Sequence, residues 1–426
     1  MKQPGTLEHA RELDLSDPLA RFRQQFVIRD PSLIYLDGNS LGRLPVKAAE
    51  AIEQSVREQW GEQLIRSWNQ EWYTQSARLG RMIAGIIGAQ PDEVIVSDST
   101  SVNLYKLAFG ALQAMEGRTE IISDDMNFPS DLYILQGLIR QLGDRNELRL
   151  LESPDGVSAE MSSLARMISR RTALVTLSHV TYKSAYLYNM KQVTDLAHKH
   201  GALILWDLSH SAGVVPVQLS QYGADLAVGC TYKYLNGGPG SPAFLYVRKA
   251  LQERLENPIQ GWFGEQNPFE FRIQFRKSEG IRKFLTGTPP VISSAGLAPA
   301  LSMIQEAGIG PIREKSMALT GYVCTLAQQW LSGEGMQTGS PAPPEQRGSH
   351  ITLKHPEAYR ISKALTDPSV GDFVVIPDFR EPDNLRFGFS PLYTSYEEAY
   401  HAMRKLKDIL AGELYLNYPL SRDPVT

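Results

Sequence analysis

The sequence predicts an α/β fold: a doubly wound, mostly parallel sheet with a smaller C-terminal α+β domain. Short apolar strands alternate with helical stretches from residue 93 to residue 248, as in successive βαβ units of an open sheet. The clearest strand, residues 202–206, is apolar throughout, as expected of a parallel strand buried on both faces, and it runs into Asp207. After residue 248 the alternation stops. We therefore expect an N-terminal segment 1–45, a large domain 46–295 and a small domain 296–426.

The elements of the first half follow from local patterns. Alternating apolar and charged residues predict helical pieces over 7–30, and a short strand over 34–36 leads into a glycine turn. Pro45 can open a helix that runs to about residue 59. Further helices are predicted over 77–88, 102–114, 132–142, 158–170 and 191–200, and strands over 93–96, 120–123, 148–151 and 172–177.

The second half has fewer strands. A long helical region is predicted over 290–331, and a loop rich in Gly, Pro and Ser over 332–348. Residues 384–389 alternate as a strand that carries Arg386. A buried arginine needs a partner, which a carboxylate ligand would supply bidentately, but a surface arginine on an edge strand is an equally good interpretation.

Composition favours an ordinary cytoplasmic enzyme. Of the 426 residues, 42% are hydrophobic and 21% are charged, and the net charge is −4, so nucleic acid or an anionic membrane is not an expected partner. Two cysteines, Cys230 and Cys324, provide neither a disulfide framework nor a zinc site. The charged N-terminus has no signal-peptide pattern, and no apolar run is long enough to cross a bilayer.

One acid and one lysine point to a specific cofactor. Asp207 ends a strand at the edge where open α/β sheets bind ligands, and Lys233 lies between two tyrosines before a glycine-rich stretch. Pyridoxal phosphate needs a lysine to capture its aldehyde and a carboxylate beside its pyridine nitrogen. Taken singly, Asp207 would be a helix cap and Lys233 a surface residue, but their occurrence together with His210 and Tyr232 favours the cofactor.

Two further stretches favour the same cofactor. Residues 97–101 place four hydroxyls between a strand and a helix, an arrangement that can bind a phosphate. N-capping is the commoner role of a lone hydroxyl residue, but four of them in five positions favour phosphate. Phe128 follows another strand end, where its ring could stack on a planar group. The tryptophans at 60, 68 and 72 are more typical of core or interface than of a ligand pocket.

Eight motifs resemble those of one family. They are YLDGNSLGRLP, STSVNL, NFPSD, WDLSHSAG, CTYKYLNGGPGSPAF, GWFG, GTPP and NLRFGFSPLY, between residues 34 and 396. Together they resemble kynureninase, a pyridoxal-phosphate enzyme of fold type I in the aminotransferase class V group. The resemblance implies the fold-type I architecture and a homodimer with shared active sites.

The resemblance also implies residue roles. The catalytic residues would be Lys233, which binds the cofactor, Tyr232, an acid or base, and Asp207, which faces the pyridine nitrogen. The remaining cofactor-binding residues would be Thr100, Ser101, Phe128, Pro129, Ser130, Asp131, Ser178, His210, Trp262 and Thr288, with Trp262 and Thr288 supplied by the partner subunit. Arg386 would bind the substrate carboxylate, and Asn39, Ser40 and Trp68 would complete the substrate site; no metal is implied.

The implied reaction is hydrolysis of the Cβ–Cγ bond of L-kynurenine to anthranilate and L-alanine in tryptophan catabolism. Whether 3-hydroxykynurenine is preferred, and whether the role is catabolic or biosynthetic in the kynurenine pathway to NAD, is left open. A cysteine desulfurase is the nearest alternative, but it needs a mobile nucleophilic thiol, which neither Cys230 nor Cys324 suits. A non-catalytic protein of this fold would need neither Lys233 nor Arg386.

Overall fold

A seven-stranded sheet forms the centre of the large part of the chain. The structure, a computed structural model, describes residues 5–421. The strand order is β2-β8-β7-β6-β5-β3-β4; the strands from β7 to β4 are parallel, and β8 is antiparallel to both neighbours. The predicted mostly parallel sheet is thus confirmed. The strands are β2 (Val94–Val96), β3 (Glu120–Asp124), β4 (Glu147–Leu151), β5 (Thr172–Ser178), β6 (Leu203–Asp207), β7 (Leu226–Gly229) and β8 (Phe244–Val247).

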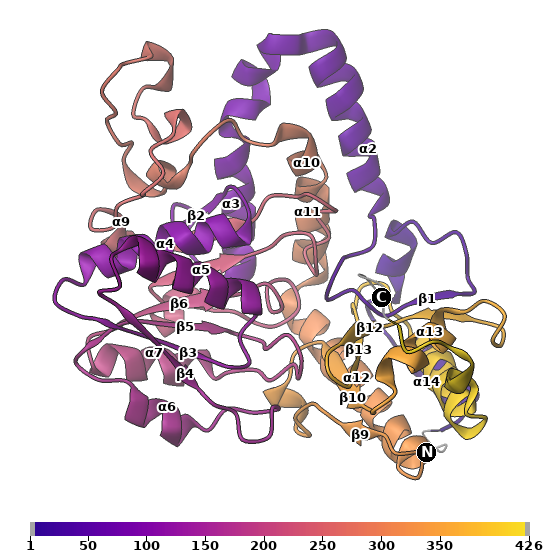
Figure 1. Cartoon of the computed structure of the whole chain (residues 1–426). Helices are drawn as coiled ribbons and strands as arrows, with labels where there is room; N and C mark the ends of the chain where they lie inside the picture. Colours follow the sequence, from indigo (N-terminus) through magenta and orange to yellow (C-terminus); the bar gives the residue numbers. More distant parts are fainter. Residues whose placement is uncertain (1–4, 422–426) are drawn as a thin grey trace.

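Helices cover both faces of this sheet, as a doubly wound fold requires (Figure 1). Alternate residues of β6 enter different cores because side chains alternate along a strand: Leu205 packs with the helices α4 and α5, whereas Ile204 and Trp206 pack with α6 and α7. The bounds are α4 (Thr100–Ala114), α5 (Pro129–Gln141), α6 (Met161–Met167) and α7 (Met190–Lys199); short helices α8 (Leu219–Tyr222) and α9 (Lys249–Gln252) follow. Helix α6 is shorter than the predicted 158–170.

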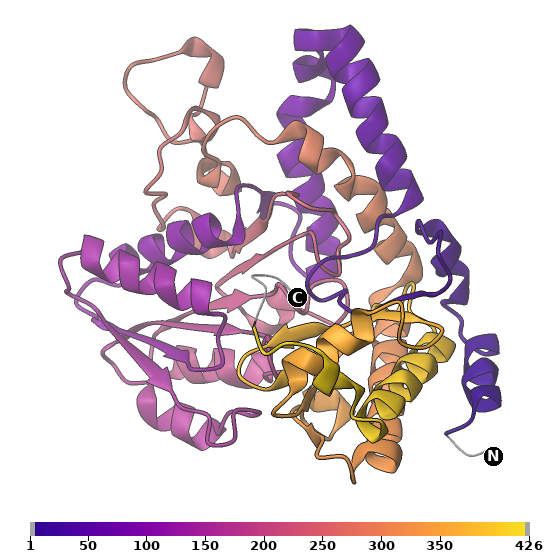
Figure 2. The same ribbon diagram turned by 45° about the vertical axis from the view of Figure 1, so that its right-hand side comes forward.

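The C-terminal part is an antiparallel sheet packed against helices (Figure 2). Its order is β12-β13-β10-β9, and it includes β9 inside the stretch predicted to be loop. The strands are β9 (Gln337–Thr338), β10 (His350–Lys354), β12 (Asp378–Arg380) and β13 (Asn384–Gly388), and the helices are α12 (Ile309–Leu331), α13 (Ala358–Thr366) and α14 (Tyr396–Ala411). The smaller α+β unit is therefore confirmed.

The N-terminal segment belongs to this C-terminal sheet region. Strand β1 (Leu33–Tyr35) pairs in parallel with β11 (Val374–Ile376), and α1 (Leu7–Leu15) packs on α14. Helix α12 begins in the core of the large sheet, with Ile312, and continues into the core of the small sheet, with Leu319. The boundaries predicted at 45/46 and 295/296 stay predictions.

A helical arm projects from the body in both views (Figures 1 and 2). It consists of α2 (Val46–Gln54), π-helical turns over Ser55–Gln63 and Trp68–Trp72 with a 3₁₀ turn over Leu64–Arg66 between them, and α3 (Tyr73–Ile87). Helices α10 (Val291–Ala295) and α11 (Leu297–Ala307) pack near it. The helix predicted to start at 77 begins earlier. Apolar side chains at the arm and at the neighbouring projecting loop remain exposed: Trp60, Leu64, Ile65, Phe269, Phe271 and Ile273. Within residues 5–421, no helix has the length and apolarity needed to cross a bilayer.

Candidate active site

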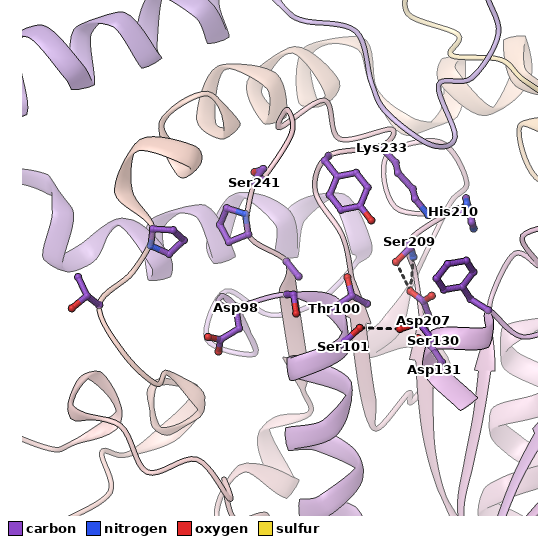
Figure 3. A pocket seen from close by; sticks show the side chains of 18 residues that line it. Asp98, Thr100, Ser101, Ser130, Asp131, Asp207, Ser209, His210, Lys233 and Ser241 are labelled. Carbon is purple, nitrogen blue, oxygen red and sulfur yellow. Dashed lines mark hydrogen bonds between the residues drawn. The ribbon is translucent and has the colours of Figure 1, made fainter. Parts of the chain in front are cut away.

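A cavity of about 590 Å³ lies at the carboxyl ends of the central strands, the edge at which open α/β sheets bind ligands. Figure 3 shows its lining side chains converging from several elements. Of the predicted site residues it includes Thr100, Ser101, Phe128, Ser130, Asp131, Asp207, His210, Tyr232, Lys233 and Thr288. It also includes Ser99, one of the four hydroxyl residues noted over 97–101, and residues that were not predicted: Asp98, Ser209, Gly240, Ser241, Pro242, Ala243 and Pro290.

Asp207 is held at the end of β6 by the turn that follows it. One carboxylate oxygen accepts hydrogen bonds from the Ser209 backbone N–H at 2.8 Å and from the Ser209 hydroxyl at 2.6 Å. Burial raises the pKa of Asp207, while these hydrogen bonds and the positive charge of Lys233 lower it. The carboxylate is therefore fixed in direction and is poised to pair with a cation in the cavity.

Lys233 lies in the loop between β7 and β8, and its side chain points toward His210 (Figure 3). The Lys233 Nζ is 3.0 Å from His210 Nε2. Burial, and then the positive charge of Lys233, lower the pKa of His210 well below its usual value. His210 is therefore neutral, and its Nε2 can accept a hydrogen bond from the lysine ammonium.

The backbone of the loop around Lys233 is packed closely against the turn that contains Gly42. The Gly42 N–H donates to the Tyr232 carbonyl at 2.8 Å, and a Cβ at Gly42 would lie 2.4 Å from the Lys233 carbonyl oxygen. Only glycine permits this approach, because real side chains do not make such contacts. The GNSLG turn therefore packs directly on the lysine loop.

Two helix N-termini meet at the cavity. Ser99 caps α4 by accepting a hydrogen bond from the Val102 N–H at 3.3 Å, and the hydroxyls of Ser101 and Ser130, at the starts of α4 and α5, lie 3.1 Å apart. Thr100 is the first residue of α4 and also lines the cavity. Backbone N–H groups and hydroxyls at converging helix N-termini are suited to an anion such as phosphate.

Phe128 presents a 41% exposed ring to the cavity. Its backbone N–H donates to the Asn127 side-chain oxygen at 2.8 Å, and that oxygen also accepts the Ser178 hydroxyl at 2.7 Å. Ser178 lies outside the cavity lining and so supports Phe128 through Asn127, while Pro129 is the first residue of α5. The ring centroid is 5.9 Å from the Lys233 Nζ.

Asp131 is a buried carboxylate with an unused oxygen. It is 3% exposed, and its Oδ2 has no hydrogen-bond partner among the described residues. Burial, and then the negative charge of Asp207, raise the pKa of Asp131. A buried polar atom without a partner is costly, so this oxygen indicates a donor on the ligand of the cavity.

Tyr232 lies beside a buried thiol. The neighbouring Cys230, and then burial, raise the pKa of Tyr232, so its phenol stays protonated and can donate a proton. Burial likewise raises the pKa of the Cys230 thiol, and Cys230 is only 3% exposed. This thiol is therefore a poor nucleophile.

Arg386 is brought together with Asn39 and Ser40, as the predicted substrate site requires. Its Nη2 donates to the Ser40 hydroxyl oxygen at 2.9 Å. In the amide orientation that satisfies both ends of the Asn39 side chain, the Asn39 oxygen accepts from Nε at 2.9 Å and from Nη2 at 3.1 Å. Its Nη1 donates to the Tyr182 carbonyl at 2.5 Å. The guanidinium also pairs with Asp378, which was not predicted.

Histidines connect this arginine to the cavity. The ring of His350, on β10, lies 5.5 Å from the ring of His210. Burial, and then the positive charges of Arg386 and Lys233, lower the pKa of His350 well below its usual value. Two neutral imidazoles therefore lie close to both Arg386 and Lys233.

Seven predicted residues are outside the cavity lining: Pro129, Ser178, the group of Arg386, Asn39 and Ser40, and the tryptophans Trp68 and Trp262. Trp262 and Trp68 pack on each other, with ring centroids 6.5 Å apart, and both contact Phe263. Thr288, by contrast, lines the cavity of its own chain, whereas the resemblance implied a contribution from a partner. The roles of all three stay predictions.

Some functional neighbours carried no sequence signal. Asp98 has a left-handed backbone (φ 45°) and pairs with the fully buried Lys106, their N–O distance being 2.7 Å. Its other oxygen accepts the Thr286 hydroxyl at 2.8 Å. Only the hydroxyl-rich context of residues 97–101 could have drawn attention to Asp98, and nothing local distinguishes Lys106.

Comparison with known proteins gives the family. The kynureninase of Pseudomonas fluorescens is 43% identical over 403 residues, which cover 93% of this chain and 94% of that protein. The kynureninase of Burkholderia mallei (strain SAVP1) is 43% identical over 415 residues, covering 96% and 97%. The chain belongs to the kynureninase family. The family model described as "Kynureninase C-terminal domain" matches residues 312–406.

Solved structures share the fold of this kynureninase-family chain at low identity. An apo cysteine desulfurase from Thermococcus onnurineus NA1 superposes with a TM-score of 0.77 at 19% identity, covering 94% of this chain and 98% of that one. A C-DES mutant with glycine covalently linked to its PLP cofactor gives a TM-score of 0.79 at 20% identity, covering 91% and 99%. These likenesses confirm the predicted fold class.

Proposed function

We propose that the chain hydrolyses L-kynurenine to anthranilate and L-alanine with pyridoxal phosphate bound in the cavity at the end of β6. One observation carries the proposal: Lys233 and Asp207 line one cavity, and Arg386 lies near His350, whose ring is 5.5 Å from that of the cavity residue His210, in a chain that is 43% identical to a kynureninase over nearly its whole length. The family's activity requires an amine, an acid and a receptor for the substrate carboxylate, and Lys233, Asp207 and Arg386 would supply them in that order.

The cavity suits pyridoxal phosphate. Asp207 offers a carboxylate to a pyridinium nitrogen, Asp131 has an oxygen without a partner, and Phe128 offers a ring face. The N-termini of α4 and α5 suit the phosphate. When bound to Lys233, the cofactor supplies an aldehyde that captures the substrate amine and a ring that accepts electrons from Cα and Cβ.

Lys233 is the proposed base at the substrate Cα. Neutral His210 accepts a hydrogen bond from the ammonium at 3.0 Å, which holds the amine in one direction while the proton is carried. Asp207 keeps the pyridine nitrogen protonated, and the two hydrogen bonds from Ser209 keep the carboxylate in place. Arg386 binds the substrate carboxylate by charge-assisted hydrogen bonds.

Tyr232 is the proposed acid at Cβ. Hydrolysis adds water to the γ-carbonyl carbon, breaks the Cβ–Cγ bond and releases anthranilate, and the electron pair left on Cβ must be protonated to give alanine. The raised pKa of Tyr232 keeps its proton available for this step.

The thiols argue against a cysteine desulfurase. That chemistry needs an accessible thiolate, but burial raises the pKa of Cys230, and Cys324 lies in α12 outside the cavity lining. The likeness to desulfurase structures therefore extends to the fold alone.

We also propose that the protein acts in the cytoplasm as a homodimer with shared active sites. The exposed apolar side chains of the arm and of the loop that carries Phe269 favour a partner surface. Trp68 and Trp262 would then reach the partner's cavity. Mixing inactive Lys233→Ala and Trp262→Ala proteins should restore activity through hybrid dimers, and no recovery in a mixed, folded sample would contradict shared sites.

The activity test uses purified protein with pyridoxal phosphate and L-kynurenine. Anthranilate release is followed by fluorescence, with 3-hydroxykynurenine in parallel to compare kcat/KM and L-cysteine as the desulfurase control. Release of anthranilate is expected; sulfide from L-cysteine without anthranilate would overturn the proposal.

A further inference from the structure

Arg386, proposed to bind the substrate carboxylate, already has two carboxylate neighbours. Asp378 is its partner across the β12–β13 pair and contacts its Nη2 directly. Asp37, which follows β1, has an oxygen 4.0 Å from the same Nη2. Arg380 forms an ion pair with Asp378, its Nε lying 3.0 Å from a carboxylate oxygen. Two arginines and two aspartates therefore form a cluster whose formal charge is zero.

Besides burial, the charged groups that shift the pKa of Asp37 are those of this cluster: Asp378, Arg386 and Arg380. The phenols of Tyr35, Tyr234 and Tyr393 surround Asp37, and burial raises the pKa of each, so they stay neutral. His350 and His210 near Arg386 are neutral as well. Arg43 lies over the Tyr35 and Tyr393 rings, 5.5 Å and 5.8 Å from their centroids.

A third carboxylate would leave this buried cluster with a net negative charge, which is costly away from water. We propose that binding of the substrate carboxylate at Arg386 is accompanied by uptake of one proton on Asp37. The inference rests on the proposed function only in placing the substrate carboxylate at Arg386.

Asp37 is a better proton acceptor than Asp378. Asp378 contacts two guanidinium groups directly, and its side chain is 4% exposed. Asp37 is farther from Arg386, and its side chain is 19% exposed, so a proton can reach it from solvent. Burial, and then the negative charge of Asp378, already raise the pKa of Asp37 to about 6.

The sign of the pH dependence follows from linkage. Below pH 6 Asp37 is already protonated in the free enzyme, so the carboxylate binds without proton uptake. Above pH 6, each further pH unit should weaken binding of the carboxylate about tenfold until the pH reaches the pKa of Asp37 in the bound state. The dissociation constant should thus rise by up to about 50-fold between pH 6 and pH 8.

The test uses the holoenzyme and 4-(2-aminophenyl)-4-oxobutanoate, a carboxylate that lacks the α-amine and therefore cannot react at Lys233. Titration calorimetry at pH 7 in phosphate and in Tris, which differ in ionisation enthalpy, gives the protons taken up. We expect about 0.9 proton per site. Buffer-independent heats, or no binding at pH 6, would overturn the proposal.

Two variants assign the proton. Asp37→Asn should bind with an affinity nearly independent of pH from 6 to 8. Asp14→Asn is the matched control, because burial also raises the pKa of Asp14 but this residue caps α14; it should keep the wild-type dependence. An unchanged dependence in Asp37→Asn would assign the proton elsewhere and refute the proposal. Failure to hydrolyse kynurenine with proton uptake intact would instead refute only the proposed function.

Discussion

Replacing Arg386 by lysine tests the carboxylate receptor without removing its charge. The Nε and Nη2 of the guanidinium contact Asn39, Ser40 and Asp378. Its Nη1 donates one hydrogen to the Tyr182 carbonyl, so the second Nη1 hydrogen is left for the substrate. Lysine retains the positive charge between the carboxylates but lacks the planar set of donors.

The size of the effect follows from one lost interaction. A hydrogen bond to a charged group contributes about 1.5–3 kcal/mol, so Arg386→Lys should lower kcat/KM about 10–150-fold. The loss should appear mainly in KM, because Arg386 contacts the substrate carboxylate and not the bond that breaks. Steady-state kinetics with L-kynurenine measure it, and urea unfolding confirms that the variant is folded. An unchanged KM in folded Arg386→Lys protein would refute the assigned role.

The remaining predictions concern the lysine, a buried ion pair and a buried acid. Lys233→Ala should abolish anthranilate release, and near-normal kcat in this variant would contradict the assignment. Lys106→Met leaves Asp98 without its cation and should reduce the free energy of unfolding by about 3 kcal/mol in urea titrations; a change below about 1 kcal/mol would contradict the pair's contribution. Burial raises the pKa of Asp124 to about 7, so this group makes the fold less stable as pH rises from about 4 to 7. The free energy of unfolding of Asp124→Asn should therefore rise by up to about 4 kcal/mol relative to that of the wild type over that pH interval. If the unfolding free energies of the two proteins ran parallel against pH, this prediction would be contradicted.

The sheet and the centre of the site could be predicted because their signals are local. Uniformly apolar strands identified the parallel sheet, and residues placed directly after strand ends, such as Asp207 and Phe128, had to meet at one edge. Lys233 was grouped with Asp207 by the needs of the cofactor and not by a predicted strand, and the structure places its loop after β7.

What could not be predicted depends on register and on contacts across the chain. Asp378 meets Arg386 only because β12 pairs with β13 in that register, and a one-residue slip would turn either side chain to the other face. Trp68 joins Trp262 through the packing of the arm on the loop that carries Phe263. No pattern in the sequence indicates that packing.

The central claim is that Lys233 and its cavity hydrolyse kynurenine. The most direct measurement is the stoichiometry of anthranilate and L-alanine released from L-kynurenine by the holoenzyme, with Lys233→Ala as control. Equal amounts of the two products are expected from the wild type and none from the variant. Cofactor bound at Lys233 with neither product formed would contradict it.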